Sequence, residues 1–594
     1  MLSSTPCSNG ARLVQPSPAA GTDRQHAIGG KRTGVLLSTG RVSHGGLTQI
    51  TDLQNSRGCY MEILRIVVLP ILLVSHCSVW AGINKGTATA NQGNYAVVSE
   101  QGPLQSEQMD DNAQFNLAQA RNGIEADGMF WKYNGKQILL LGGMAYGEPH
   151  LIPRAELVRE LDKLKASGGN YMRMTMVSVF DKTRIQGLYP FIKRSDGRFD
   201  LDQFNPAFWD YVRVLFEETQ KREMVVQVEL WDQWEFYRGN YDETYWNPKN
   251  NINYDSSATG LDTSLPVEPY KESPAFFSAY RDANKAVVLK YQTAFIQKLL
   301  EVAKPFNNII YEIGNESTEP QEWNDYWAKY IKSRAGKKIY VTDQREDYDP
   351  GGNLTYVLNN PSLYNFIDVS QLGMRHITAD YHQEHYNDVI NVRDKILSSG
   401  IKRPMNNVKG YKWIRSWGGG YKGGESVSIN RFWHGIFAGL AGFAFHPSNY
   451  DAEDRAGSAM MPNVLRNIKS MRMLEERVNI MRMSPSNHLL NERSVDEAYL
   501  LSSQSQYAVY FTGKTDRRVT LTRSSSESIK LVWLNPETGK LGSPITITGT
   551  IITLQAPGVG RHVAILSNDS ARSSTAPAAF LYNHANPEKT RIPN

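Results

Sequence analysis

The stretch Asn308-Ile-Ile-Tyr-Glu-Ile-Gly-Asn-Glu-Ser317 decides how this chain is interpreted. It begins as an apolar run typical of a buried strand and ends in Gly314 followed by the pair Asn315-Glu316. In a barrel of parallel strands, the carboxyl ends of the strands carry the functional side chains. A carboxylate beside an amide suits acid/base work on a glycosidic bond, since the amide can bind a sugar hydroxyl. The alternative is an ordinary surface Asn-Glu pair after a core strand.

The chain around this motif alternates strand-like and helix-like stretches. Strands are predicted at 137–142, 170–175, 224–231, 308–317, 338–343, 366–371, 404–408 and 441–446. Helices are predicted at 153–167, 205–222, 288–299, 384–399, 428–439 and 460–480. Eight strands alternating with helices predict an α/β fold, a (β/α)₈ TIM barrel over residues 123–483.

The ends of the predicted strands define a catalytic face before any function is considered. The residues on that face are Arg173, Trp231, Asp232, Asn315, Glu316, Arg345, Gln371, Lys409 and His446. We expect Asn315, Arg173, Trp231, Asp232, Gln371, Lys409 and His446 to bind substrate. Arg173 can also pair with a neighbouring acid, and His446 can equally be a core histidine.

A second domain is predicted behind the barrel, at residues 484–568. Short strands follow one another at 507–511, 519–521, 529–533, 545–547, 551–554 and 562–566, joined by turns such as Asn535-Pro-Glu-Thr-Gly539. This spacing predicts a small antiparallel β-sandwich. Residues 569–594 are polar and predicted to be a disordered tail.

The amino-terminal part predicts export. Met61-Glu-Ile-Leu-Arg-Ile-Val-Val-Leu-Pro-Ile-Leu-Leu-Val74 is a short apolar run that is followed by Val79-Trp80-Ala81. A run of this length is too short to span a bilayer, which favours a signal peptide at 61–81, a secreted or periplasmic protein and no stable membrane span. Lipid attachment at Cys77 is the less favoured alternative. Residues 1–60 are a doubtful leader, because a signal peptide should begin the chain, and 82–122 form a polar linker.

Charge and cysteine content exclude several classes of protein. The net charge is +5, but residues 1–60 carry six Lys/Arg and two Asp/Glu, so the body is nearly neutral and offers no basic face for nucleic acid. All three cysteines precede residue 78, so the body can hold neither disulfides nor thiolate metal sites. No cofactor is expected. Aromatic residues make up 10% of the chain, which permits sugar stacking.

With these residues in hand, the barrel resembles the clan A glycoside hydrolases of the cellulase or apiosidase type. Asn315-Glu316 is similar to the acid/base motif of that clan, and Arg173 after Asn170-Tyr171 is similar to its strand-two arginine. Phe199-Asp-Leu-Asp-Gln-Phe-Asn-Pro206 resembles the segment before helix two. Val532–Gly539 and Ala556–His562 resemble the collagen-binding-type β-domain often fused behind such barrels, a label that says little about collagen. The resemblance covers residues 123–568.

One position departs from this family. Its retaining members carry a second Glu at the end of strand seven, where this chain has Lys409. Lysine cannot be the glycosyl nucleophile, because the covalent intermediate forms on a carboxylate. The second carboxylate can come from Glu425, Glu229 or Asp232, the enzyme can invert configuration, or the barrel can have lost hydrolysis and only bind glycans. Lys409 near Glu316 would lower the pKa of Glu316 and could bind an acidic sugar.

Two further groups of residues have alternative interpretations. The loop after the third strand carries a run of aromatic residues that can form a sugar-stacking wall or pack beneath a lid: Trp231, Trp234, Phe236, Tyr237, Tyr241, Tyr245 and Trp246. A second group combines histidines with acids: His376, Asp380, His382, Glu384 and His385. Its spacing does not match a zinc-binding helix, so no metal site is predicted.

Together these observations predict an exported glycoside hydrolase of clan A type that cleaves a polysaccharide or oligosaccharide. The resemblance implies that Glu316 donates the proton, Asn315 holds a ring hydroxyl and Arg173 organises the site. Glu425 is the first candidate for the second carboxylate. The alternative is a non-catalytic glycan-binding protein on the same barrel, and a weaker one is an adhesion protein acting through its β-sandwich.

Overall fold

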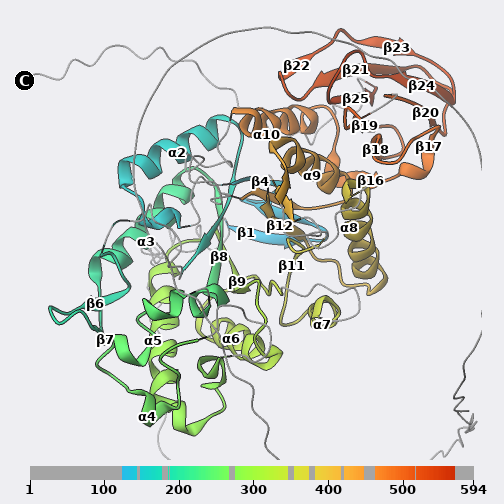
Figure 1. The fold of residues 1–594 in the computed structure, drawn as a ribbon. Helices are drawn as coiled ribbons and strands as arrows, with labels where there is room; N and C mark the ends of the chain where they lie inside the picture. The colour runs from blue at the N-terminus through green and yellow to red at the C-terminus, as the bar shows by residue number, and fades with distance from the viewer. Residues whose placement is uncertain are drawn as a thin grey trace, which may run out of the picture. The chain divides into compact units, whose positions relative to one another are not determined.

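The computed structural model describes residues 123–568 (Figure 1). It leaves out 144–147, 177–184, 186, 238, 266–273, 346–352, 373–380, 412, 416–420, 447–461 and 515–516. The predicted leader, signal peptide, linker and tail therefore lie outside the described residues, as do all three cysteines, His376 and Asp380.

Eight parallel strands form a barrel in the order β10-β9-β8-β5-β4-β15-β12-β11. These are β4 (Leu140–Gly143), β5 (Tyr171–Thr175), β8 (Val225–Asp232), β9 (Ile309–Asn315), β10 (Val341–Thr342), β11 (Ile367–Asp368), β12 (Met405–Gly410) and β15 (Gly442–Phe445). The backbone N–H of Asn365 donates to Val341 O over 2.8 Å, which brings the two outer strands of this order together. The predicted barrel is confirmed.

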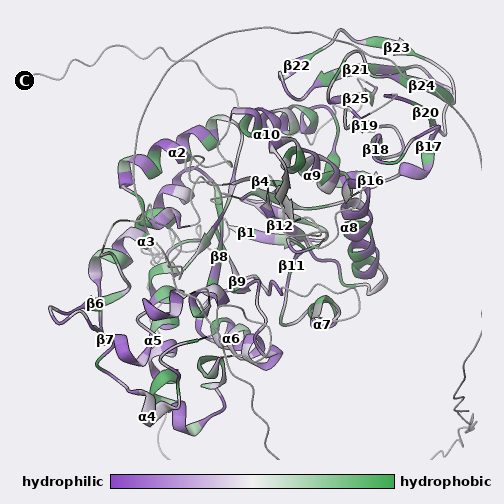
Figure 2. Cartoon of the chain, in the orientation of Figure 1, coloured by the Kyte–Doolittle hydropathy of each residue, from purple (hydrophilic) through white to green (hydrophobic). Residues whose placement is uncertain are grey.

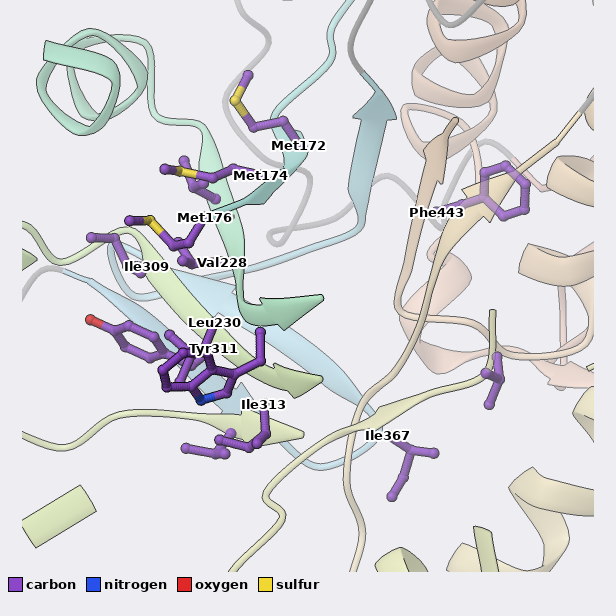
Figure 3. Close-up of a cluster of buried hydrophobic side chains, with 14 of the residues drawn as sticks. Met172, Met174, Met176, Val228, Leu230, Ile309, Tyr311, Ile313, Ile367 and Phe443 are labelled. Carbon is purple, nitrogen blue, oxygen red and sulfur yellow. The ribbon is translucent and has the colours of Figure 1, made fainter. Parts of the chain in front are cut away.

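The strands β4 and β5 pack closely because a glycine lies at their point of contact. A Cβ added at Gly142 would lie 1.8 Å from Tyr171 O, so only glycine lets β4 and β5 approach as they do. Along β5, Met172 and Met174 alternate with polar or aromatic neighbours and are fully buried. Figure 3 shows both methionines in one cluster with Val228 and Leu230 of β8. The alternate residues of β5, Tyr171 and Arg173 among them, are thus left for the barrel interior, where they bond to Gln227 and Asn315.

Helices surround the strands. They are α2 (Arg154–Ala166), α3 (Pro206–Lys221), α5 (Ala286–Ala303), α6 (Gln321–Arg334), α7 (Asn353–Asn359), α8 (Tyr381–Ser398), α9 (Glu425–Phe437) and α10 (Pro462–Glu475), with the short α4 (Ser256–Thr259) in the third loop. In α3 the Asn205 side chain accepts from Ala207 N, and Pro206 occupies the first turn, where its missing N–H costs nothing. Figure 2 shows hydrophilic and hydrophobic residues mixed along these helices, as expected where one face packs on the core. The helices α6 and α7 were not predicted from the sequence.

A three-stranded antiparallel sheet packs on the amino ends of the barrel strands. It comprises β1 (Ile124–Asp127), β2 (Phe130–Tyr133) and β3 (Lys136–Ile138). The strands β1 and β2 were not predicted, and β3 overlaps only the start of the predicted strand at 137–142. Trp131 is fully buried there, with its ring edge-on to Tyr340 and Phe366 at 5.5 and 5.3 Å. Its Nε1 donates to Asn406 Oδ1 over 2.9 Å. This sheet closes the end of the barrel opposite the predicted site.

Two short hairpins lie in the connections. They are β6 (Phe191–Lys193) with β7 (Phe199–Phe204), and β13 (Trp413–Arg415) with β14 (Tyr421–Gly423). The second hairpin joins β12 to α9.

The predicted β-sandwich is confirmed after residue 484. One sheet holds β16 (Ser484–Pro485), β18 (Ala498–Ser502), β19 (Tyr507–Phe511), β25 (His562–Ser567), β21 (Ile529–Asn535), β22 (Lys540–Leu541) and β23 (Ile545–Ile547). The other holds β17 (Leu490–Asn491), β20 (Arg518–Thr522) and β24 (Ile551–Gln555). Apolar residues of both sheets, such as Val509 and Leu554, share one buried core. The strands β16, β17, β18 and β22 were not predicted.

The sandwich contacts α9 of the barrel through buried polar and aromatic groups. Trp433 of α9 stacks on Tyr510 of β19 with ring centroids 5.1 Å apart and an interplanar angle of 10°. Asn430 Oδ1 accepts from Tyr510 OH over 2.6 Å and from Arg561 Nε over 2.7 Å. Because these donors and acceptors are buried, breaking the contact would leave them unpaired. We call this contact the α9 seam.

Candidate active site

Glu316 follows β9 directly and adopts a backbone conformation that side chains rarely take. Its φ is 48°, in the left-handed region, and such strain in a non-glycine residue concentrates at functional sites. The preceding Gly314 is required, because an added Cβ would lie 2.7 Å from Ser317 Cβ. The turn thus directs the Glu316 side chain to the carboxyl end of the barrel.

The Glu316 carboxylate accepts hydrogen bonds from three side chains. Lys409 Nζ donates to Oε1 over 2.6 Å, Tyr411 OH donates to the same oxygen over 3.2 Å, and Trp234 Nε1 donates to Oε2 over 3.0 Å. The Lys409 side chain is 1% exposed and that of Glu316 is 19% exposed. Burial would raise the pKa of Glu316, but the charge and hydrogen bond of Lys409 outweigh it and lower the pKa to about 2.

Asn315 connects Glu316 with three other groups of the site. Its Oδ1 accepts from Lys409 Nζ over 2.6 Å and from Arg173 Nη2 over 3.2 Å. Its Nδ2 donates to Asp232 Oδ1 over 3.0 Å. The amide expected to hold a sugar hydroxyl therefore already binds protein groups through its oxygen and one N–H. The role of Asn315 in binding a sugar stays a prediction.

Arg173 of β5 forms a buried ion pair with Glu229 of β8. Arg173 Nε and Nη2 both donate to the carboxylate, and Thr175 Oγ1 donates to Glu229 Oε2 over 2.6 Å. Side-by-side donors on a planar guanidinium fit the two oxygens of a carboxylate. Glu229 is thus held by Arg173 and does not contact Glu316 by any hydrogen bond within the described residues.

Asp232, at the end of β8, behaves differently from Glu316. Its Oδ1 accepts from Trp234 N and Asn315 Nδ2, each over 3.0 Å, and the residue is 4% exposed. Burial raises the pKa of Asp232 to about 7, against the lowering effect of these two hydrogen bonds. The end of the barrel therefore pairs a carboxylate that stays ionised with a carboxyl group that holds its proton up to neutral pH.

The remaining predicted site residues lie in less direct positions. The His446 ring lies 4.3 Å from that of Tyr411, and burial, helped by the positive charges of Arg173 and Lys409, holds the pKa of His446 well below its usual range. Gln371 follows β11, and its buried Nε2 has no hydrogen-bond partner in the described part of the chain.

Trp231 and Glu425 contact residues outside the cluster around Glu316. Trp231 packs against Phe295 of α5 and Trp327 of α6, with ring centroids 5.8 and 5.2 Å away. Glu425 begins α9, and its Oε2 accepts from Asn463 Nδ2 of α10 over 2.8 Å. The assignment of Glu425 as the second carboxylate stays a prediction, and no hydrogen bond joins it to Glu316 among the described residues.

The aromatic residues after β8 pack in the core. Trp234, Phe236, Tyr237, Tyr241, Tyr245 and Trp246 are at most 6% exposed. Their rings contact one another and Phe276, which leaves no open stacking surface among these six side chains. The packing interpretation therefore holds, with one addition: Trp234 also reaches Glu316.

A layer of buried polar groups lies deeper in the barrel and was missed by the sequence analysis. Gln227 Nε2 donates to Glu312 Oε2 and, over 3.0 Å, to Asp368 Oδ2, while Tyr171 OH donates to Gln227 Oε1. Burial and the nearby charges of Glu229 and Asp368 hold the pKa of Glu312 well above its usual range. The available signal was a polar residue within an apolar run, as in Tyr311-Glu312-Ile313.

A second missed acid lies on the loop after β9. Glu319 is 2% exposed, both its oxygens are buried without a hydrogen-bond partner in the described part of the chain, and burial raises the pKa of Glu319 to about 7.

The histidine group on α8 does not form a metal site within the described residues. His385 Nδ1 and His434 Nε2 of α9 are 2.9 Å apart, and the rings of His382 and His434 are 5.3 Å apart. No group of three or more His, Cys, Asp or Glu side chains in the described part of the chain could hold a metal ion. Nor does any described helix combine the length and apolarity needed to cross a membrane.

The fold was compared with solved structures. A protein described as a glycoside hydrolase matches with a TM-score of 0.52 at 14% identity, over 76% of this chain and 98% of its own. A glycoside hydrolase family 5 structure from Bacteroides vulgatus matches equally well, over 77% of this chain and 97% of its own. This chain shares the fold of these glycoside hydrolases. At such identity the likeness concerns the fold alone, and no family model and no curated protein matches the sequence.

Proposed function

We propose that this protein hydrolyses glycosidic bonds of a polysaccharide or oligosaccharide at the carboxyl end of its barrel. The observation that carries this proposal is a pair of carboxyl groups, Asp232 and Glu316, at the ends of neighbouring strands and connected by Asn315. Glycoside hydrolysis needs two such groups, one that is ionised and one that holds a proton. The shared fold and the strained backbone at Glu316 support the same conclusion.

Arg173 contributes by fixing the positions of two neighbouring side chains, Glu229 and Asn315. It holds Glu229 and contacts Asn315 Oδ1, so the amide that connects the two carboxyl groups cannot rotate freely. Side chains that are already fixed in position lose less entropy when the reactive geometry forms. The positive charge of Lys409 balances the negative charge of Glu316, and Lys409 does not replace a carboxylate in the chemistry.

Release of reducing sugar from a panel of neutral and acidic polysaccharides tests the proposal. The protein without its first 81 residues should hydrolyse at least one member of the panel, and the Glu316→Gln variant should not. A preference for uronic or sulfated polymers would identify an acidic sugar as the substrate. Absence of release from every member would contradict the proposal.

A non-catalytic glycan-binding protein is the second candidate, and the ion pair between Lys409 and Glu316 favours it. Lys409 stands at the strand end where the resemblance implies a nucleophile, and its Nζ lies 2.6 Å from Glu316. Calorimetric titration with the same panel distinguishes the two candidates. Binding without release of sugar would support this second function.

Export is part of the proposal. We infer that the run beginning at Met61 directs secretion and that cleavage follows Ala81. Amino-terminal sequencing of the protein recovered from a secreting bacterial host tests this, and a mature chain beginning at Gly82 is the expected result.

A further inference from the structure

The ends of β8 and β9 bring two carboxyl groups into one hydrogen-bonded chain. Asp232 and Asn315 are partners in the register of these strands, and Asn315 immediately precedes Glu316. Through Asn315, Asp232 is joined to Lys409, which in turn holds Glu316. Both carboxyl groups accept from Trp234, but only Glu316 is bonded to a cation, and this difference bears on which of them handles the proton.

Glu316 is built to stay ionised. Its Oε1 accepts from both Lys409 Nζ and Tyr411 OH, so both lone pairs of that oxygen are engaged. Its Oε2 accepts from Trp234 Nε1 and keeps one lone pair. A proton on Glu316 could occupy only this remaining lone pair of Oε2, and the adjacent charge of Lys409 disfavours it. The remaining lone pair of Oε2 is therefore suited to attack an electrophilic carbon.

Asp232 has the opposite character. Both of its hydrogen bonds go to Oδ1, and no cationic side chain bonds to it within the described residues. Its Oδ2 accepts no hydrogen bond from the described residues, so this is the oxygen left to carry a hydrogen and to meet a ligand. Burial raises the pKa of Asp232 to about 7, which agrees with a carboxyl group that carries a hydrogen on Oδ2.

We propose that Asp232 is the proton donor of the site and that Glu316 is the carboxylate nucleophile, an exchange of the role that the resemblance implies for Glu316. This rests on the proposed hydrolase function. Glu316 Oε2 forms a bond to the anomeric carbon while the glycosidic C–O bond breaks, and its electron pair leaves on the oxygen that takes the Asp232 proton. Water then loses a proton to Asp232, its oxygen bonds to the anomeric carbon, and the ester bond to Glu316 breaks with its electrons returning to the carboxylate.

Lys409 acquires a positioning role in this scheme. A nucleophilic carboxylate must also leave in the second half of the reaction, and an adjacent cation favours the departing anion. The lysine at the seventh strand end is thus compatible with hydrolysis, because the nucleophile has moved to the fourth strand end and the donor to the third.

Glu319 is the matched control. It is also a buried carboxyl group whose pKa is raised to about 7 by burial, but both its oxygens are fully buried and it makes no hydrogen bond to Asn315. If any buried, protonated acid near this loop were sufficient, Glu319→Gln would affect the reaction as Asp232→Asn does.

The test compares two glycosides of the sugar that the wild-type protein hydrolyses, one with an alkyl leaving group and one with a dinitrophenyl leaving group that departs without a proton. In Asp232→Asn, kcat/KM should fall by about 100- to 10,000-fold on the alkyl glycoside and change little on the dinitrophenyl glycoside. Added azide, which needs no base, should raise turnover of that variant. Glu316→Gln should lose both substrates, and Glu319→Gln should lose neither.

Three results would overturn the assignment while leaving the hydrolase function intact. These are loss of only the alkyl substrate in Glu316→Gln, unchanged activity in Asp232→Asn, or equal loss of both substrates in Asp232→Asn with its melting temperature retained. If Asp232→Asn does not fold, the wild-type pH profile decides, because kcat/KM on the alkyl glycoside alone should fall as the pH rises through about 7. A wild-type protein that hydrolyses nothing overturns the proposed function itself.

Discussion

Glu312 and Glu316 belong to the same short stretch around β9, yet their surroundings favour opposite protonation states. Around Glu312 the barrel offers amides, a phenol and other acids, and the pKa of Glu312 is well above its usual range because burial dominates. Around Glu316 it offers Lys409, and the pKa of Glu316 is lowered to about 2 against the effect of burial. The charge of Lys409 lowers both pKa values, but of these two acids only Glu316 is hydrogen-bonded to Lys409, and this bond separates the layer around Glu312 from the layer around Glu316.

The largest expected effect comes from exchanging each acid for its amide. Glu316→Gln should reduce hydrolysis by at least about 1,000-fold, because the reacting carboxylate is lost. Glu312→Gln should keep activity within about tenfold, because glutamine resembles the protonated acid already present. Reducing-sugar assays on both variants check this. Equal losses in the two variants would show that the two layers do not differ in function.

The second test removes the cation that creates the difference. Lys409→Met should destabilise the fold by about 3–5 kcal/mol, because Glu316 is left as a buried charge without its partner. The pKa of Glu316 should rise in the same variant. Urea unfolding measures the stability loss, and the double variant Lys409→Met with Glu316→Gln should recover part of it. A double variant as unstable as the sum of the single ones would argue against the pairing.

The third test acts at the amino-terminal end of the barrel, on Trp131. Trp131→Ala should cost about 3–5 kcal/mol, since it removes a fully buried ring and the donor to Asn406 Oδ1. If activity at saturating substrate is nevertheless retained in the folded fraction, the two ends of the barrel are independent. A selective loss of kcat with normal stability would contradict that separation.

The smallest expected effect concerns three histidines of α8 and α9, whose pKa values are lowered mainly by burial. Burial, with the charges of Arg431, Arg561 and Lys514, lowers the pKa of His382 from 6.5 to about 3. The pKa values of His385 and His434 are also well below their usual range because of burial. The unfolded chain binds these protons first, so stability is complete above about pH 6.5 and declines as the pH falls.

Melting temperatures between pH 8 and pH 4.5 measure this decline, which should amount to several degrees. His382→Asn should show a shallower slope than the wild-type protein. An unchanged slope in that variant would mean that acid destabilises the fold through other groups, such as carboxylates in ion pairs.

The barrel could be predicted because an apolar strand recurs eight times along the chain, with helices between several of the strands. In a barrel of parallel strands the carboxyl ends all lie at the same end. For that reason Arg173, Asp232, Asn315, Glu316 and Lys409 were all expected at one face, and the structure brings them into one hydrogen-bonded cluster. A lowered pKa of Glu316 was expected on the condition that Lys409 lies near it, and the structure meets that condition. What the sequence could not provide is the direction of a side chain at a strand end.

The missed elements have identifiable causes. Trp231 packs outward against α5 and α6, although its position in the strand is compatible with either side. Glu425, the first candidate for the second carboxylate, begins a helix and bonds to Asn463 there, and its role stays a prediction. The strands β1 to β3 are only three or four residues long, too short for a clear alternating pattern.

The α9 seam has a consequence for how the protein melts. Buried contacts join Trp433 and Asn430 of the barrel to Tyr510 and Arg561 of the sandwich. If either domain unfolded alone, polar atoms and an aromatic ring of the other would lose their partners. The two domains should therefore behave as one cooperative unit, with a single calorimetric transition whose enthalpy reflects both. The carboxy-terminal domain would then stabilise the barrel as well as itself.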